Sequence, residues 1–353
     1  MTIFHFANQL NLSPKTALKL TALCLLPALY FPAQAQAEGK LNIYCSMQNA
    51  ACEKISQTFA EKYKVKTQFV RNSTGTVLGK IKSEKDNPQA DVWYGGTLEP
   101  HLQAADLGLL EKYRSPNQKD IMPQFNKIMA QRGDYTSIVY LMELAIGVNT
   151  KKLAELNIAP PKCLADLLDP RFKNQIQYAD PRVSGTGYSF IATMVSLLGE
   201  DKAFDYFAKL NKNVAQFSKS GLATNKLATG EVAIDVSFMN AYIREEEKGA
   251  PVKGIRPCEG VGYTLGASSI IKGARNLENA KLFTDWVLTK EAQEAPWQET
   301  HSYQLPANIH AQPYNKARLP KNPHFIDMDM LRFGSAEESK RLIERWVDTT
   351  LNQ

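Results

Sequence analysis

Residues 41–94 read LNIYCSMQNAACEKISQTFAEKYKVKTQFVRNSTGTVLGKIKSEKDNPQADVWY, and the pattern of this stretch predicts an α/β fold. It contains short β-rich runs at 41–44, 66–70 and 91–94, separated by longer helical patterns near 49–63 and 76–84. Strands that alternate with helices form repeated β-α-β units. We therefore expect a largely parallel sheet that is covered by helices.

A second set of the same kind begins at residue 176. Strands are expected at 176–178, 214–217 and 232–238, with helices near 188–198, 200–210 and 222–229. Two apolar runs, Ser137–Asn149 and 262–271, read as extended strands that cross between two lobes, and amphipathic helices follow near 276–289 and 335–350. The prediction is a discontinuous first lobe of residues 38–142 and 266–353, and a second lobe of residues 143–265.

Residues 1–37 have the order of regions found in a secretory signal. They carry Lys15 and Lys19 without any acidic residue, then an apolar run at 20–31, then small residues that end at Ala35 and Ala37. The apolar run is too short for a membrane span, which needs about 20 residues. We expect cleavage near Ala37 and export to the periplasm; the alternative is a buried N-terminal helix.

The exported chain would keep four cysteines: Cys45, Cys52, Cys163 and Cys258. An even number of cysteines in an oxidising compartment predicts two disulfides. Three pairings are possible, and the local pair, Cys45 with Cys52, would leave Cys163 with Cys258. The spacings contain no Cys-x-x-Cys, so a metal site is not expected.

Composition and motifs argue against several classes of protein. The 353 residues carry 42 basic and 36 acidic side chains, a formal charge of +6, without the basic run typical of nucleic-acid binding. The chain has no Gly-x-Ser-x-Gly elbow, no phosphate loop and no His-Glu-x-x-His helix. We expect no cofactor and no enzyme, and keep an exported enzyme that uses the same cleft as the less favoured alternative.

Small polar residues and glycines gather where predicted strands give way to helices, at 46–49, 72–76, 95–97, 184–187 and 220–221. The start of a helix exposes unpaired N–H groups and a partial positive charge, which suit an anion. Any one cluster is equally well explained as a helix cap. Because ligands of open α/β sheets bind beyond the carboxyl ends of the strands, clusters from both lobes can converge on one cleft.

Several motifs resemble those of the periplasmic substrate-binding proteins of ABC importers, and of their AfuA-like group in particular. They are Ile43-Tyr44-Cys45-Ser46, residues 87–97, Asp180-Pro181 with Ser184-Gly185-Thr186, residues 199–206, Lys219-Ser220-Gly221 and Pro257-Cys258-Glu259-Gly260. The resemblance covers nearly the whole exported chain. It implies a type II periplasmic binding protein fold, with two α/β lobes, two hinge strands and a ligand cleft between the lobes. It also implies transient delivery of the ligand to a permease in the inner membrane, and we expect a monomer.

The same resemblance assigns a binding site for a small anionic solute. By this resemblance, the residues expected to contact the phosphate are Ser46, Ser73, Thr74, Gly75, Thr97, Ser184, Gly185, Thr186 and Ser220. Glu259 and Asn240 are expected to contact the rest of the ligand. The family often has a His-Asp pair where this chain has Asn240-Ala241, and a Glu where it has Thr264. These departures count against a hexose phosphate, and the expected ligand is a small organic anion: another sugar phosphate, a different organophosphate or a phosphonate.

Ferric iron is the alternative ligand, because the group was long labelled as iron binders. Ferric-binding relatives hold the ion with an adjacent Tyr-Tyr pair, and no two of the 14 tyrosines here are adjacent. An iron site would need isolated tyrosines to converge, namely Tyr44, Tyr94, Tyr188 and Tyr263.

Overall fold

The computed structural model describes residues 39–219, 223–319 and 321–352. The predicted signal at 1–37 and the candidate Ser220 lie outside the described residues. From Ala37 onward the chain forms one compact unit. Within the described ranges, no helix has the length and apolar character needed to cross a bilayer.

The predicted first β-α-β units are confirmed. Strand β1 (Lys40–Cys45) pairs in parallel with β2 (Lys66–Arg71) and with β3 (Val92–Tyr94). The connections are α1 (Asn49–Tyr63) and α2 (Thr74–Ser83), and α3 (Leu98–Asp106) follows β3. Ile55 and Phe59 lie four residues apart on α1 and are fully buried, which is how the apolar stripe of a helix covers a sheet.

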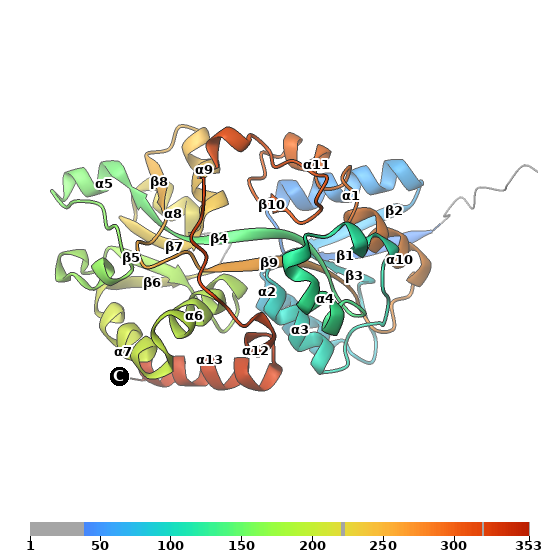
Figure 1. Ribbon diagram of the computed structural model, residues 1–353, viewed down its shortest axis with the longest axis horizontal. Helices are drawn as coiled ribbons and strands as arrows, with labels where there is room; N and C mark the ends of the chain where they lie inside the picture. The colour runs from blue at the N-terminus through green and yellow to red at the C-terminus, as the bar shows by residue number, and fades with distance from the viewer. Residues whose placement is uncertain (1–38, 220–222, 320, 353) are drawn as a thin grey trace, which may run out of the picture. The chain divides into compact units, whose positions relative to one another are not determined.

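Two long strands cross between the lobes, as predicted. Strand β4 (Ser137–Asn149), all of whose residues are buried, pairs antiparallel with β9 (Tyr263–Ile270). The β9 strand continues the first lobe through β3, and β4 continues the second through β7 (Ile234–Phe238). The result is one sheet of order β2-β1-β3-β9-β4-β7-β5-β6, in which the crossing strands are the antiparallel members (Figure 1).

The second lobe repeats the parallel plan. Strand β5 (Ile176–Ala179) pairs in parallel with β6 (Val214–Ser218) and β7, and β8 (Val252–Ile255) pairs antiparallel with β4. The helices are α5 (Thr150–Glu155), α6 (Gly185–Leu198), α7 (Glu200–Leu210), α8 (Ala223–Thr229) and α9 (Met239–Glu247). Tyr178, Phe190 and Phe207 meet edge to face or tilted in the core between strand and helices.

The remaining elements are α4 (Asn126–Arg132), α10 (Leu277–Val287), α11 (Ala295–Glu299), β10 (Leu305–Pro306), α12 (Met330–Phe333) and α13 (Ala336–Thr350). Short 3-10 turns occupy Pro116–Asp120, Pro123–Phe125, Ala165–Leu168, Pro170–Phe172, Asn211–Asn213 and Lys316–Arg318.

The position of the last helix, α13, differs from the prediction, which placed residues 266–353 together in the first lobe. On α13, the Trp346 Nε1 donates a 2.9 Å hydrogen bond to the Tyr178 hydroxyl of β5. Arg341 and Arg345 of the same helix form ion pairs with Glu200 at the start of α7. Figure 1 shows α13 beside α7, so α13 packs mainly on the second lobe. A strongly amphipathic helix takes whichever apolar face the tertiary fold offers it.

Both predicted disulfides are present. Cys45 at the end of β1 is bonded to Cys52 in the first turns of α1, and Cys163 is bonded to Cys258, 95 residues further along the chain. The first bond ties the strand that leads into the candidate site to the helix that follows it.

Candidate functional site

A cavity of about 90 Å³ lies where the two lobes meet beside the crossing strands. Both lobes and β4 contribute to its wall. The lining residues are Ser46, Met47, Gln48, Arg71, Ser73, Thr74, Gly96, Thr97, Tyr140, Met142, Thr186, Thr224, Asn225, Ser237, Phe238, Asn240, Ala241, Arg244 and Gln304.

Helix N-termini surround this cavity. Its wall includes residues at the starts of α1, α2, α3, α6 and α9, where the first N–H groups have no partner inside the helix. Within the described ranges, the side chains of Gln48, Ser73 and Thr97 occupy N-cap positions without capping these N–H groups. Several partial positive charges therefore point toward one small space, which favours an anion.

Two arginines, one from each lobe, add full positive charges. Arg71 ends β2, and its Nε donates a 2.9 Å hydrogen bond to the Met47 carbonyl. Arg244, on α9, has a side chain that is 16% exposed, and its Nε lies 3.5 Å from the Glu245 carboxylate. Burial lowers the pKa of both guanidinium groups, which still remain charged at any physiological pH. In the described part of the chain Arg71 forms no ion pair, so its charge is available to a ligand.

Two amide oxygens in the wall are buried without a partner. Asn240 Oδ1, in the first turn of α9, and Gln304 Oε1, next to β10, accept no hydrogen bond from any described residue. Gln304 instead donates from Nε2 to Gln48 Oε1 at 3.4 Å. Buried acceptors are normally satisfied, so a group bound in the cavity can supply the hydrogen-bond donors that these two oxygens lack.

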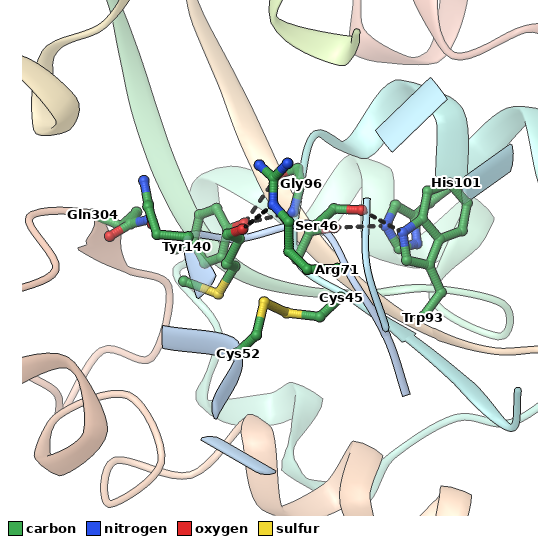
Figure 2. Close-up of a disulfide and its surroundings, with 12 residues drawn as sticks. Cys45, Ser46, Cys52, Arg71, Trp93, Gly96, His101, Tyr140 and Gln304 are labelled. Atoms are coloured by element: carbon green, nitrogen blue, oxygen red, sulfur yellow. Dashed lines mark hydrogen bonds between the residues drawn. A yellow bond between two sulfur atoms is a disulfide. The ribbon is translucent and has the colours of Figure 1, made fainter. Parts of the chain in front are cut away.

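Two hydroxyl groups that line the cavity, those of Tyr140 and Ser46, are held by hydrogen bonds (Figure 2). The Tyr140 hydroxyl accepts from the Gly96 amide at 2.7 Å and donates to the Gly96 carbonyl at 3.1 Å. The Ser46 hydroxyl accepts from Trp93 Nε1 at 3.1 Å, and the Trp93 ring stacks on His101 at 3.7 Å. Figure 2 shows Tyr140 between Gln304 and Arg71, with the Cys45–Cys52 disulfide below them.

His101, which stacks on Trp93, is a packing residue. It is fully buried, with Nδ1 2.9 Å from the Ser269 hydroxyl and Nε2 3.1 Å from the Gly95 carbonyl. Burial lowers the pKa of its imidazole to about 3, so the ring is neutral at physiological pH.

Hydrogen bonds join the two lobes next to the cavity. The Ser73 hydroxyl of the first lobe donates to the Val183 carbonyl of the second at 2.6 Å. Glu99 at the start of α3 is fully buried and accepts from the hydroxyls of Ser189 at 3.1 Å and Thr264 at 3.0 Å. Burial raises the pKa of the Glu99 carboxyl. Thr264, one of the departures noted above, thus serves the contact between the lobes and does not line the cavity.

The structure brings six of the candidate ligand residues together. These are Ser46, Ser73, Thr74, Thr97, Thr186 and Asn240, which come from five separate regions of the chain. The candidates Gly75, Ser184 and Gly185 lie just outside, on a neighbouring groove between the lobes. Ser184 caps α6 by accepting from the Gly187 amide at 3.5 Å.

Glu259 does not reach the cavity. Its carboxylate accepts hydrogen bonds from the backbone amides of Leu164 and Ala165, each at 2.9 Å. The Cys163–Cys258 disulfide holds it there, because each cysteine is adjacent in sequence to one of the partners. Glu259 therefore caps the turn that follows Cys163 and does not line the cavity with the other candidates.

Sequence reasoning missed the arginines and the glutamines. Arg71 directly precedes the polar cluster at 72–76, so its position at a strand end was a usable signal. Arg244 lies one helical turn after Asn240 and therefore on the same face of α9. Gln304 carries no local signal, because it reaches Gln48, in the polar cluster at 46–49, through an interaction over 256 residues.

Comparisons with known proteins agree with this architecture. A family model described as bacterial extracellular solute-binding protein matches residues 88–332. The periplasmic binding protein P5PA is 53% identical in sequence, with a TM-score of 0.86 over 88% of this chain and 99% of its own. AfuA from Actinobacillus pleuropneumoniae, solved with exogenous fructose-6-phosphate bound, is 47% identical, with a TM-score of 0.85 over 89% and 99% of the two chains. A protein of Salmonella typhimurium, named as a candidate 2-aminoethylphosphonate-binding periplasmic protein, is 26% identical over 78% of this chain and 82% of its own.

Proposed function

The chain belongs to the family of bacterial extracellular solute-binding proteins, and we propose that its solute is a small organic phosphate or phosphonate. The observation that carries this proposal is the pair Arg71 and Arg244, which line one cavity together with uncapped helix N-termini. Guanidinium groups bind phosphate oxygens through paired, charge-assisted hydrogen bonds. The sugar phosphate in the related AfuA structure supports the same class of ligand.

The chemistry of the wall argues against ferric iron. Iron as a hard cation favours carboxylate and phenolate oxygens, whereas the described lining residues include two arginines and neither Asp, Glu nor His. Tyr140 is the tyrosine among them, and burial raises the pKa of its phenol, which favours the protonated form. Tyr44, Tyr94, Tyr188 and Tyr263 do not line this cavity.

The transport role extends this proposal to the partner and the place of action. The exported protein captures its ligand in the periplasm as a monomer and presents it to the permease of an ABC importer. An importer component returns its ligand unchanged, whereas an enzyme would convert it. Incubating the protein with bound ligand and identifying the released compound by mass spectrometry distinguishes the two roles.

Calorimetric titration tests the ligand class. The panel comprises inorganic phosphate, sugar phosphates, glycerol phosphates, other phosphomonoesters, phosphonates and ferric citrate. We expect a phosphate or phosphonate compound to bind and ferric citrate not to bind. Tight binding of ferric ion, with a phenolate-to-iron absorption band, would refute the proposal.

Substitution of Arg71 tests the role of the guanidinium directly. Arg71→Gln should weaken binding of the best phosphate ligand about 10- to 150-fold, because a charge-assisted hydrogen bond contributes about 1.5–3 kcal/mol. The matched control is Arg171→Gln, which removes an arginine that is 65% exposed and that, among the described residues, forms an ion pair with Asp169 alone. Equal affinities of the two variants would show that Arg71 does not bind the phosphate.

A further inference from the structure

We infer that the part of the ligand beyond its phosphate carries no positive charge and donates hydrogen bonds, as hydroxyl groups do, to Asn240 and Gln304. This inference rests on the proposed function and narrows it. It selects hydroxyl-bearing phosphates or phosphonates over those that carry an ammonium group, such as 2-aminoethylphosphonate.

The first argument is the charge balance of the cavity. Its described lining residues contribute two guanidinium groups and no carboxylate. Glu245, which follows Arg244 on α9, is already paired, with Lys248 Nζ at 2.9 Å and Arg244 Nε at 3.5 Å. An ammonium group in this space would lose its water shell without gaining a counter-ion, beside two like charges. The two negative charges of the phosphate match the two guanidinium charges. No protein charge then remains to pair with a charge on the rest of the ligand.

The second argument is the pair of buried acceptors. Asn240 Oδ1 and Gln304 Oε1 lie in residues that are 5% and 2% exposed, and neither accepts a hydrogen bond within the described residues. A ligand that fills the cavity without donating to them would leave both oxygens unsatisfied. The two guanidinium charges disfavour an ammonium donor. The group of the ligand that donates to these oxygens is therefore neutral, and a hydroxyl group is the simplest such donor. A site built to bond a hydroxyl discriminates strongly against an analogue that lacks it.

The third argument is the spacing on α9. Asn240 and Arg244 are four residues apart, so their Cβ atoms lie about 5–6 Å from each other on one face of the helix. A single compact ligand can therefore contact Arg244 with its phosphate and Asn240 with a hydroxyl two or three bonds away.

Matched pairs of ligands test the inference by calorimetry. One pair is 2-hydroxyethylphosphonate and 2-aminoethylphosphonate, and the other is glucose 6-phosphate and glucosamine 6-phosphate. In any pair that binds, we expect the hydroxyl compound to bind at least about tenfold more tightly. Equal or tighter binding of the ammonium compound overturns the inference. So does a best ligand, from the whole panel of phosphates, that carries an ammonium group or lacks any neutral donor.

The same titrations separate failure of the inference from failure of the proposed function. If no phosphate or phosphonate binds, the proposed function is wrong. If phosphates bind without selection against ammonium, the proposed function stands and the inference is wrong.

A charge substitution of nearly equal size provides the second test. Asn240→Asp places a carboxylate in the wall, so affinity for the hydroxyl compound should fall at least about tenfold, and the ratio should shift toward the ammonium compound. The control is Asn157→Asp, which adds the same charge at an exposed position outside the cavity. Thermal unfolding establishes that each variant is folded. A folded Asn240→Asp protein with the original preference contradicts the role of Asn240.

Discussion

Asp235 is a buried carboxyl that the candidate site does not use. It lies in β7, fully buried, and its Oδ2 accepts a 2.8 Å hydrogen bond from the Tyr242 hydroxyl. Burial raises the pKa of Asp235 to about 7, because a charge there would be cut off from water. The folded protein therefore holds a proton on Asp235 that the unfolded chain, with an ordinary pKa near 3.9, releases.

This difference predicts a loss of stability with rising pH. The stabilisation is fully present below the unfolded pKa and is lost as pH rises through the folded pKa of about 7. Urea unfolding should show that Asp235 lowers the free energy of unfolding by roughly 2–3 kcal/mol between pH 5 and pH 8. Asp235→Asn should remove this part of the pH dependence. The control Asp86→Asn, at an exposed position, should behave as the wild type does, and an Asp235→Asn protein with the wild-type pH dependence would contradict the assignment.

At the scale of single elements, the two disulfides stabilise segments with different roles. Cys45–Cys52 closes a short loop between β1 and α1, directly beside Ser46 and Gln48 of the cavity. Cys163–Cys258 closes a much longer loop and holds Glu259 on the amides of Leu164 and Ala165. Because the entropy that a cross-link removes from the unfolded chain grows with loop length, the second bond should contribute more stability.

Replacing each cysteine pair by serine tests this difference. Loss of Cys163–Cys258 should cost about 4–5 kcal/mol and loss of Cys45–Cys52 about 2–3 kcal/mol in urea unfolding. The Cys163–Cys258 variant, when folded, should keep the ligand affinity of the wild type, since neither residue lines the cavity. A larger cost for the short loop would show that strain or residual structure outweighs chain entropy here.

At the scale of the whole molecule, closure depends on how closely the lobes approach each other. A Cβ atom on Gly185, the first residue of α6, would overlap the Thr97 side chain of the first lobe. A Cβ on Gly75, in α2, would lie 2.8 Å from the Val183 backbone of the second lobe. The two glycines thus allow backbone of one lobe to touch the other, while β4 and β9 connect the lobes.

Gly185→Ala should therefore hinder closure. We expect ligand affinity to fall at least about tenfold, because a ligand favours the closed form only through contacts that both lobes complete. Small-angle scattering should show ligand-induced compaction of the wild type and less compaction of the variant. The control is Gly79→Ala, on α2, where a Cβ meets open space. Unchanged affinity and compaction in Gly185→Ala would mean that this contact does not limit closure.

Much of the fold could be predicted from the sequence. Periodicity is a local property, so the runs at 41–44, 49–63 and 66–70 correspond to β1, α1 and β2 within a residue or two. The apolar run at Ser137–Asn149 could be read as a crossing strand because no polar face interrupts it. The disulfides followed from an even number of cysteines and one short separation. These features depend on neighbours along the chain.

The composition of the site needed the three-dimensional arrangement. Arg71 and Arg244 line one cavity because the tertiary fold places β2 and α9 around it, and no local sequence pattern records that arrangement. Glu259 follows a motif of the binding-protein family, yet the disulfide and a nearby turn hold it elsewhere. The amphipathic pattern of α13 predicts a buried face without naming the lobe that buries it. Side chains converge through long-range packing, whereas a sequence pattern reports only which face of each element is apolar.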